Sequence, residues 1–155
     1  MLDLHQNAFT EFKAIPCSAK LDTISLSFNF LTNIDNLENA PNVSVIDLHN
    51  NKLKTLPTSL LKLYSLKTLN IGNNDLADIN PRIGLLDNLI HISIEGNPLR
   101  TLKPSMRSAN AVALKRYLKL RIDETVVAEE EKVQDAAKNL PGAKTEYDHW
   151  DICPA

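Results

Sequence analysis

The chain has 155 residues and a formal net charge of −2; 43% of the residues are hydrophobic and 23% are charged, which is the balance of a folded, soluble protein and excludes disorder throughout. Leucine occurs 24 times and asparagine 16 times, whereas aromatic residues make up only 5%. An aliphatic composition with recurrent asparagine favours a small repeated unit. No apolar run approaches the roughly 18 residues that span a bilayer. The first twenty residues lack a secretory signal, so we expect a cytoplasmic chain, with a cytoskeletal or nuclear location as alternatives.

One aliphatic spacing, LxxLxLxxNxL, occurs four times in the first two thirds of the chain. The four copies begin at Leu21, Val43, Leu66 and Leu89, which are 22, 23 and 23 residues apart. Residues 2–9 fit the second half of a fifth copy whose first position is missing. Five copies in register predict stacked turns, each with one short strand whose alternate side chains face inward.

This spacing resembles that of the leucine-rich repeat family over residues 1–102. The resemblance implies an α/β solenoid in which a curved parallel sheet forms the concave face. Stacking of neighbours stabilises such a chain, because one turn cannot bury its own apolar face. We divide the sequence into about five repeats at 1–102, a C-terminal capping helix at 103–122, and an acidic helix with an aromatic-containing tail at 123–155.

The asparagine at the ninth position of each repeat has a structural role in this interpretation. Its side-chain amide can both donate and accept hydrogen bonds, so it can pair backbone groups of neighbouring turns that would otherwise be buried without partners. The predicted structural ladder comprises Asn7, Asn29, Asn51, Asn74 and Asn97.

The first turn begins inside its strand motif, which predicts an open apolar edge. The side chains expected at this edge are Leu2, Leu4, Phe9 and Phe12. Because stacked turns need a cover at each end, we expect the chain to belong to a longer protein or to a complex. The alternative is that residues 1–20 form a divergent cap of their own.

Residues 105–122 predict one continuous helix over the last turn. Apolar residues recur there at three- and four-residue spacing on one side, and the cations lie on the other. These apolar residues are Ala111, Leu114, Tyr117, Leu118 and Ile122. The run GNPLR before the helix and the segment ALKRYLKLRI within it resemble the C-terminal end of one branch of the family, leucine-rich repeat-containing protein 40 and its relatives.

The C-terminal third of the chain separates its charges into two blocks. Residues 100–122 carry seven basic residues and no acid, whereas residues 123–155 carry nine acids and three lysines. Adjacent blocks of opposite charge can satisfy each other, so nucleic acid is not an expected partner. Tyr147 and Trp150 lie in the last acidic segment. Disordered tails are usually poor in large aromatic residues, so we expect these two to dock, either on this chain or on a partner.

Few residues suggest chemistry. The four glycines form no nucleotide-binding loop of the GxGxxG or GxxxxGKS type. His5 and His49 belong to strands two apart, roughly 10 Å, which is too far to share a zinc ion with ligands within about 2.3 Å. Asp47 and Glu95 are also two strands apart, but a shallow sheet gives no closed site that would shift a pKa. Cys17 has no basic neighbour and is expected to be a partly buried thiol, and two cysteines fit a reducing compartment. We expect no catalytic residue, no cofactor and no metal.

The outward face of the strands is the strongest candidate for function. There the aromatic Phe28 lies among small polar and acidic groups, as in protein-binding patches; the alternative is that it folds back as packing over the edge of its turn. The expected partner-binding residues are Asp3, His5, Ser25, Phe28, Val45, Asp47, His49, Asn70, His91, Glu95, Tyr147 and Trp150.

We predict a non-catalytic protein-interaction or scaffold subunit that does not insert into a membrane. It would bind a protein partner through the concave face, the open N-terminal edge or the acidic tail. Two alternatives stay open: a regulatory repeat segment of a larger signalling enzyme, such as a kinase, GTPase or ubiquitin ligase, and a structural component of a cytoskeletal or multisubunit assembly.

Overall fold

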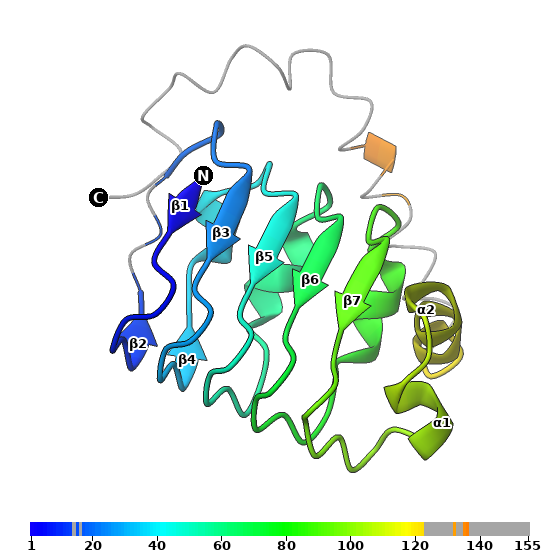
Figure 1. Ribbon diagram of the computed structural model, residues 1–155. Helices are drawn as coiled ribbons and strands as arrows, with labels where there is room; N and C mark the ends of the chain where they lie inside the picture. The colour runs from blue at the N-terminus through cyan, green and yellow to red at the C-terminus, as the bar shows by residue number, and fades with distance from the viewer. Residues whose placement is uncertain (14, 16, 123–131, 133–134, 137–155) are drawn as a thin grey trace.

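Five short strands form one parallel sheet in the computed structural model, which describes residues 1–13, 15, 17–122, 132 and 135–136. The sheet order is β1-β3-β5-β6-β7, so each strand is added beside the one before it (Figure 1). The bounds are β1 Leu2–Asp3, β3 Thr23–Ser25, β5 Val45–Asp47, β6 Thr68–Asn70 and β7 His91–Ser93. The parallel sheet with few helices is an α/β, leucine-rich-repeat-like fold.

The register of the sheet places the same repeat position of every turn side by side. It pairs Leu2 with Ile24, Ile24 with Ile46, Ile46 with Leu69, and Leu69 with Ile92. Alternate side chains of a strand face opposite sides of the sheet, and these residues face the core. Ile24, Ile46 and Leu69 are fully buried, whereas Leu2 at the edge is half-buried. Each interior turn is therefore closed by its two neighbours.

The chain returns behind the sheet through three short 3-10 helices (Figure 1). They are η1 Leu37–Asn39, η2 Thr58–Lys62 and η3 Pro81–Leu85. Each helix directs an aliphatic side chain toward the strands, and Leu37, Leu60 and Ile83 are fully buried. These residues complete the aliphatic core of their turns.

The first two turns also pair outside the main sheet. β2 (Glu11–Phe12) lies parallel to β4 (Asn33–Ile34). This second sheet was not predicted from the sequence, because two residues per strand are too few to show an alternating pattern. Its effect is to fix the return segments of the first two turns against each other.

The prediction of one continuous helix over residues 105–122 is wrong. The structure has two helices, α1 (Pro104–Arg107) and α2 (Ala111–Lys119). The separation occurs at Asn110, which is extended and accepts a hydrogen bond from the Ala113 amide at 2.9 Å through its side-chain oxygen. Asparagine is a favoured N-cap, so α2 begins directly after it.

The second of these helices packs closely on η3, the return helix of the last turn. Leu114 and Leu118 of α2 are fully buried. Gly84 of η3 makes the approach possible, since a Cβ at this position would lie 2.8 Å from the Lys115 carbonyl oxygen. The helix thus lies over the end of the last turn.

Cations of α2 also contact this turn. The Lys115 ammonium donates to the carbonyl oxygens of Asp87 and Leu89, at 3.1 Å each, and its burial lowers the pKa of Lys115. The Lys119 ammonium lies 3.7 Å from the Asp87 carboxylate. Part of the basic block therefore binds the folded repeats.

Little of the acidic tail belongs to the described residues. Lys132, Asp135 and Ala136 are helical and exposed. Tyr147 and Trp150, which were predicted to dock, lie outside the described residues. Within the part of the chain that the structure describes, no helix is both long and apolar enough to cross a lipid bilayer.

Candidate interaction face

Asparagine side chains join consecutive turns where the strands end. The Asn51 amide nitrogen donates to the Leu48 carbonyl of its own turn at 3.0 Å and to the Leu26 carbonyl of the preceding turn at 2.9 Å. Its oxygen accepts from the Leu31 amide at 3.0 Å. The same three kinds of bond are made by Asn29, Asn74 and Asn97. These bonds fix the loops that carry the outward residues.

The first turn is less tightly held than the interior turns. Asn7 is exposed, and among the described residues its amide donates only to carbonyl oxygens of its own turn, those of Leu4 and His5. Phe9 is 37% exposed, and its ring meets the half-buried Phe12 ring edge to face at 6.2 Å. The apolar residues predicted for the N-terminal edge are therefore half-buried or exposed.

The outward strand residues form rows across the sheet. The register brings one row together from all five strands: Asp3, Ser25, Asp47, Asn70 and Ser93. A second row places Val45 beside Thr68, and Thr68 beside His91. The predicted partner-binding residues of the sheet thus share one face.

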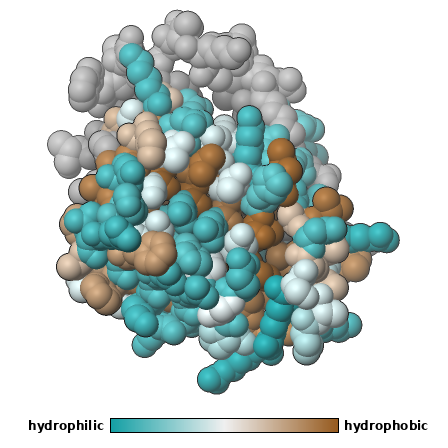
Figure 2. Space-filling view, in the orientation of Figure 1, coloured by the Kyte–Doolittle hydropathy of each residue, from teal (hydrophilic) through white to brown (hydrophobic). Residues whose placement is uncertain are grey.

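This face is polar and anionic when its histidines are neutral. The strands and the two residues after each contain the acids Asp3, Asp47 and Glu95 but no lysine or arginine. Figure 2 shows hydrophilic residues predominating in the view of Figure 1, with hydrophobic residues in small separate patches. The face therefore complements a partner that carries positive charge.

Two of the acids also hold the turn after their strand. Asp3 accepts hydrogen bonds from the His5 ring at 2.9 Å and from the His5 backbone amide at 3.2 Å. The bond from the His5 ring is the main reason that the pKa of the Asp3 carboxyl is lowered. Asp47 accepts from the His49 backbone amide at 3.1 Å. These acids thus have a local structural role in addition to their charge.

Phe28 is the exposed aromatic side chain at the end of β3. It is 48% exposed, and its ring meets the His49 ring of the next turn at 5.6 Å and 68°. Gly72 lies on the other side of His49, and a Cβ there would be 3.0 Å from its Nδ1. Phe28 therefore leans on a neighbouring turn and keeps about half of its surface in water.

The residue before each asparagine of the ladder, which we call a rung, adopts a left-handed backbone conformation. These residues, with φ between 50° and 72°, are Gln6, Phe28, Asn50, Asn73 and Gly96. Glycine and asparagine tolerate this region, whereas other side chains pay about 1–2 kcal/mol. This conformation was not predicted from the sequence, although the pairs Asn-Asn at 50–51 and 73–74 and Gly-Asn at 96–97 could have indicated it.

A groove of about 490 Å³ runs beside Phe28 along the loops that follow the strands. Phe30, which is 56% exposed, forms part of its wall, and Lys52 and Asp75 supply charges of both signs. Sequence reasoning missed Phe30, because it lies between two inward-facing repeat positions. The outward face thus continues into an edge with two exposed aromatic rings.

The other candidate residues divide into two groups. Val45 and Asn70 are half-buried on the outward face, whereas His91 and Glu95 are exposed.

Cys17 is exposed and disulfide-bonded, so the expectation of a partly buried thiol is wrong. Within the described ranges, no three histidine, cysteine, aspartate or glutamate side chains converge as metal ligands would.

The chain is similar in sequence to part of several Toll-like receptors. No protein-family model matches the chain. It is 34% identical to Toll-like receptor 1 of Homo sapiens over 99 residues, which are 62% of this chain and 12% of the receptor. It is 36% identical to Toll-like receptor 6 of Homo sapiens over 74 residues, and 35% identical to that of Mus musculus over 74 residues; each match covers 48% of this chain and 9% of the receptor.

The matches therefore span only about a tenth of the length of these curated relatives. Together with the repeat spacing and the parallel sheet, they support a leucine-rich repeat relationship. They do not support the narrower resemblance to leucine-rich repeat-containing protein 40, which stays a prediction.

Proposed function

We propose that the chain is a non-catalytic protein-interaction module, an arc of stacked repeats at 1–102 closed by the helical region at 103–122. It binds a protein partner on the concave face of the sheet, and the N-terminal edge and the acidic tail at 123–155 are further contact surfaces. Support comes from the aligned outward rows and from the similarity to Toll-like receptors 1 and 6, which are receptors by name.

The strongest support for this proposal is the exposed ring of Phe28 on a left-handed backbone. Phe28 occupies the left-handed position where the next two turns have Asn50 and Asn73, at a cost of about 1–2 kcal/mol. Its exposed half stabilises nothing in the isolated chain. Aromatic side chains of this kind act as anchors when a partner buries them. We therefore assign Phe28 as the anchor of the interface.

The charges around Phe28 define the chemistry of the partner. The strands and the two residues after each hold Asp3, Asp47 and Glu95 but no lysine or arginine, although His5 pairs with Asp3 and Lys52 lines the groove beside Phe28. A partner with basic groups around an apolar side chain would match both the acids and the ring, because complementary charge favours encounter and orientation.

Photo-crosslinking tests this assignment. The variant Phe28→p-benzoylphenylalanine should form a covalent adduct with one discrete protein, identified by mass spectrometry. The control carries the same group at Val112, which is 76% exposed on α2. Adducts that are the same at both positions, or absent at position 28, would remove the proposal.

A second variant separates binding from folding. Phe28→Asn should change the free energy of unfolding by no more than about 1 kcal/mol, because relief of the left-handed strain offsets the lost contact of the ring with His49. It should also weaken the identified partner by about tenfold or more, as expected for an interface anchor. Chemical denaturation and a binding titration measure the two effects, and unchanged affinity would contradict the assignment.

A further inference from the structure

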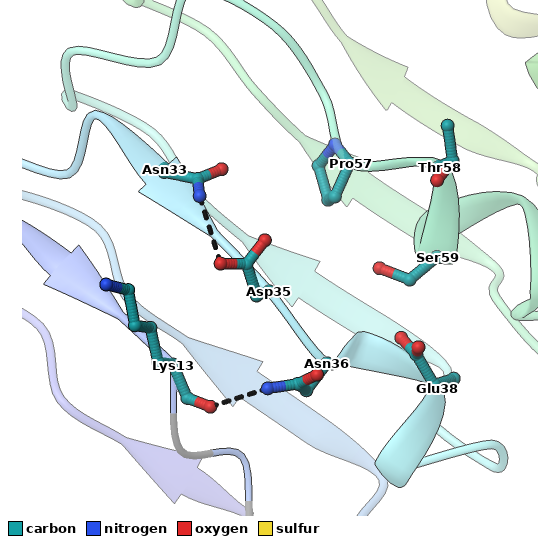
Figure 3. Close-up of a pocket in the computed structure, with 8 residues that line it drawn as sticks. All are labelled: Lys13, Asn33, Asp35, Asn36, Glu38, Pro57, Thr58 and Ser59. Atoms are coloured by element: carbon teal, nitrogen blue, oxygen red, sulfur yellow. Dashed lines mark hydrogen bonds between the residues drawn. The ribbon is translucent and has the colours of Figure 1, made fainter.

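A second concave site lies among the return segments, away from the outward face. It has a volume of about 420 Å³ and is built by the end of β2, by β4, and by the starts of η1 and η2 (Figure 3). The side chains around it are Lys13, Asn33, Asp35, Asn36, Glu38, Pro57, Thr58 and Ser59. Three consecutive turns thus contribute to one pocket.

Ser59 gives the first indication of a ligand. The residue is only 9% exposed, and its hydroxyl oxygen has no hydrogen-bond partner among the described residues. Figure 3 shows this hydroxyl pointing into the pocket, toward the side that holds Asp35, with Glu38 below it in this view. Burial of an unpaired hydroxyl opposes folding, so a ligand group that paired with Ser59 inside the pocket would remove this cost.

The pocket is anionic. Asp35 and Glu38 each contribute a carboxylate, and the cation at the rim, Lys13, is paired with Glu11 at 2.7 Å. This ion pair holds the pKa of Lys13 above its usual value. Because Glu11 compensates Lys13, the charges that remain for a ligand are negative, and an anionic ligand is disfavoured.

The amide groups at the pocket are already used as donors. The Asn33 amide nitrogen donates to the Asp35 carboxylate at 3.0 Å, and that of Asn36 donates to the Lys13 carbonyl at 2.8 Å, as Figure 3 shows. The carboxylates of Asp35 and Glu38 can only accept, and the Ser59 hydroxyl can accept as well as donate. The pocket therefore suits a cation with several N–H donors.

We propose that this pocket binds the guanidinium group of an arginine side chain from a protein partner. A guanidinium carries five N–H donors in a fixed plane and is less strongly hydrated than an ammonium, so it can serve several separate acceptors at once. Free arginine fits less well, because its carboxylate would meet the carboxylates of Asp35 and Glu38, while the cation at the rim, Lys13, is already paired with Glu11. The site is independent of the concave face and goes beyond the function proposed above.

The test is a titration of the full chain followed by amide NMR shifts. N-acetyl-arginine N-methylamide should produce saturable shifts at residues 35–38 and 58–59. Free arginine, N-acetyl-lysine N-methylamide and calcium chloride should each bind at least about fivefold more weakly, the factor expected of one partly exposed ion pair. Equal or tighter binding of any of these three would overturn the proposal and assign the pocket to that ligand class.

Two variants and a matched control make the result specific. Glu38→Gln should weaken the arginine probe by about fivefold, whereas Glu95→Gln removes the same charge from the outward face and should leave the affinity unchanged. Ser59→Ala should weaken the probe without lowering the melting temperature. Equal effects of the two glutamate variants, or unchanged affinity of Ser59→Ala, would overturn the assignment.

Discussion

Replacement of Asn74 with alanine tests whether the asparagine rungs hold the turns together. Its nitrogen lies 3.0 to 3.1 Å from the carbonyl oxygens of Leu48, Ile71 and Gly72, and its oxygen accepts from the Leu53 amide at 3.1 Å. Because the amide has only a pair of N–H groups, these contacts amount to about three hydrogen bonds. At roughly 1 kcal/mol for each bond, Asn74→Ala should lower the free energy of unfolding by about 3 kcal/mol. A domain of this size typically has about 5–15 kcal/mol in total.

Denaturant unfolding, followed by circular dichroism, measures this loss against two other asparagines. Asn7 is exposed, and its side-chain bonds within the described ranges stay in its own turn, so Asn7→Ala should cost less than about 1 kcal/mol. Asn88 is also exposed, with one bond to the Tyr64 carbonyl at 2.7 Å, and Asn88→Ala should stay within about 0.5 kcal/mol. Equal and small losses at Asn74 and Asn88 would refute the reasoning.

Three further expectations concern other parts of the fold. Gly96→Ala should lower the melting temperature, because φ is 72° and the new Cβ would overlap the side-chain amide of the preceding turn; Gly72→Ala is the matched control. Truncation after Leu102 should expose the end of the last turn and cause self-association in sedimentation experiments; a monomeric product that melts cooperatively would contradict this. Ser44 donates to Asp22 at 2.6 Å and lowers the pKa of that carboxyl. Asp22 therefore stabilises the fold above its unfolded-state pKa, and this contribution is lost as the pH falls through the folded-state pKa. Ser44→Ala should raise the pKa in an NMR titration, and an unchanged pKa would count against the bond.

The parallel sheet was predictable because the same physical demand recurs in every turn. Each strand must bury an aliphatic residue at the same position, so Ile24, Ile46 and Leu69 appear at regular spacing and lie side by side. A short strand carries little information alone, but several copies in register do. The C-terminal helix lacked such copies for comparison, and the break at Asn110 was missed.

The candidate sites were less predictable because they depend on departures from the repeat. Phe28 has a left-handed backbone that no aromatic residue favours, and the conformation is signalled by its equivalents Asn50, Asn73 and Gly96. Glu38 and Ser59 belong to return segments that differ in length and residue type from turn to turn. No spacing in the sequence brings these two together; the stacking of the second turn on the third does.

The ladder asparagines also determine how the stack of turns would respond to a pulling force. Each ladder asparagine after Asn7 bonds the turn before it, so the junctions between turns lie in series. When the stack is pulled along its length, these junctions can open one at a time. The first turn is joined to the second by Asn29, which bonds Leu4 and Phe9; among the described residues it is held on that side alone, so it would open first. Each turn that opens releases 22 or 23 residues, which extend to roughly 80 Å. A stretched molecule of this design would lengthen in steps of nearly equal size. The force needed for each step would depend on the asparagine hydrogen bonds between neighbouring turns.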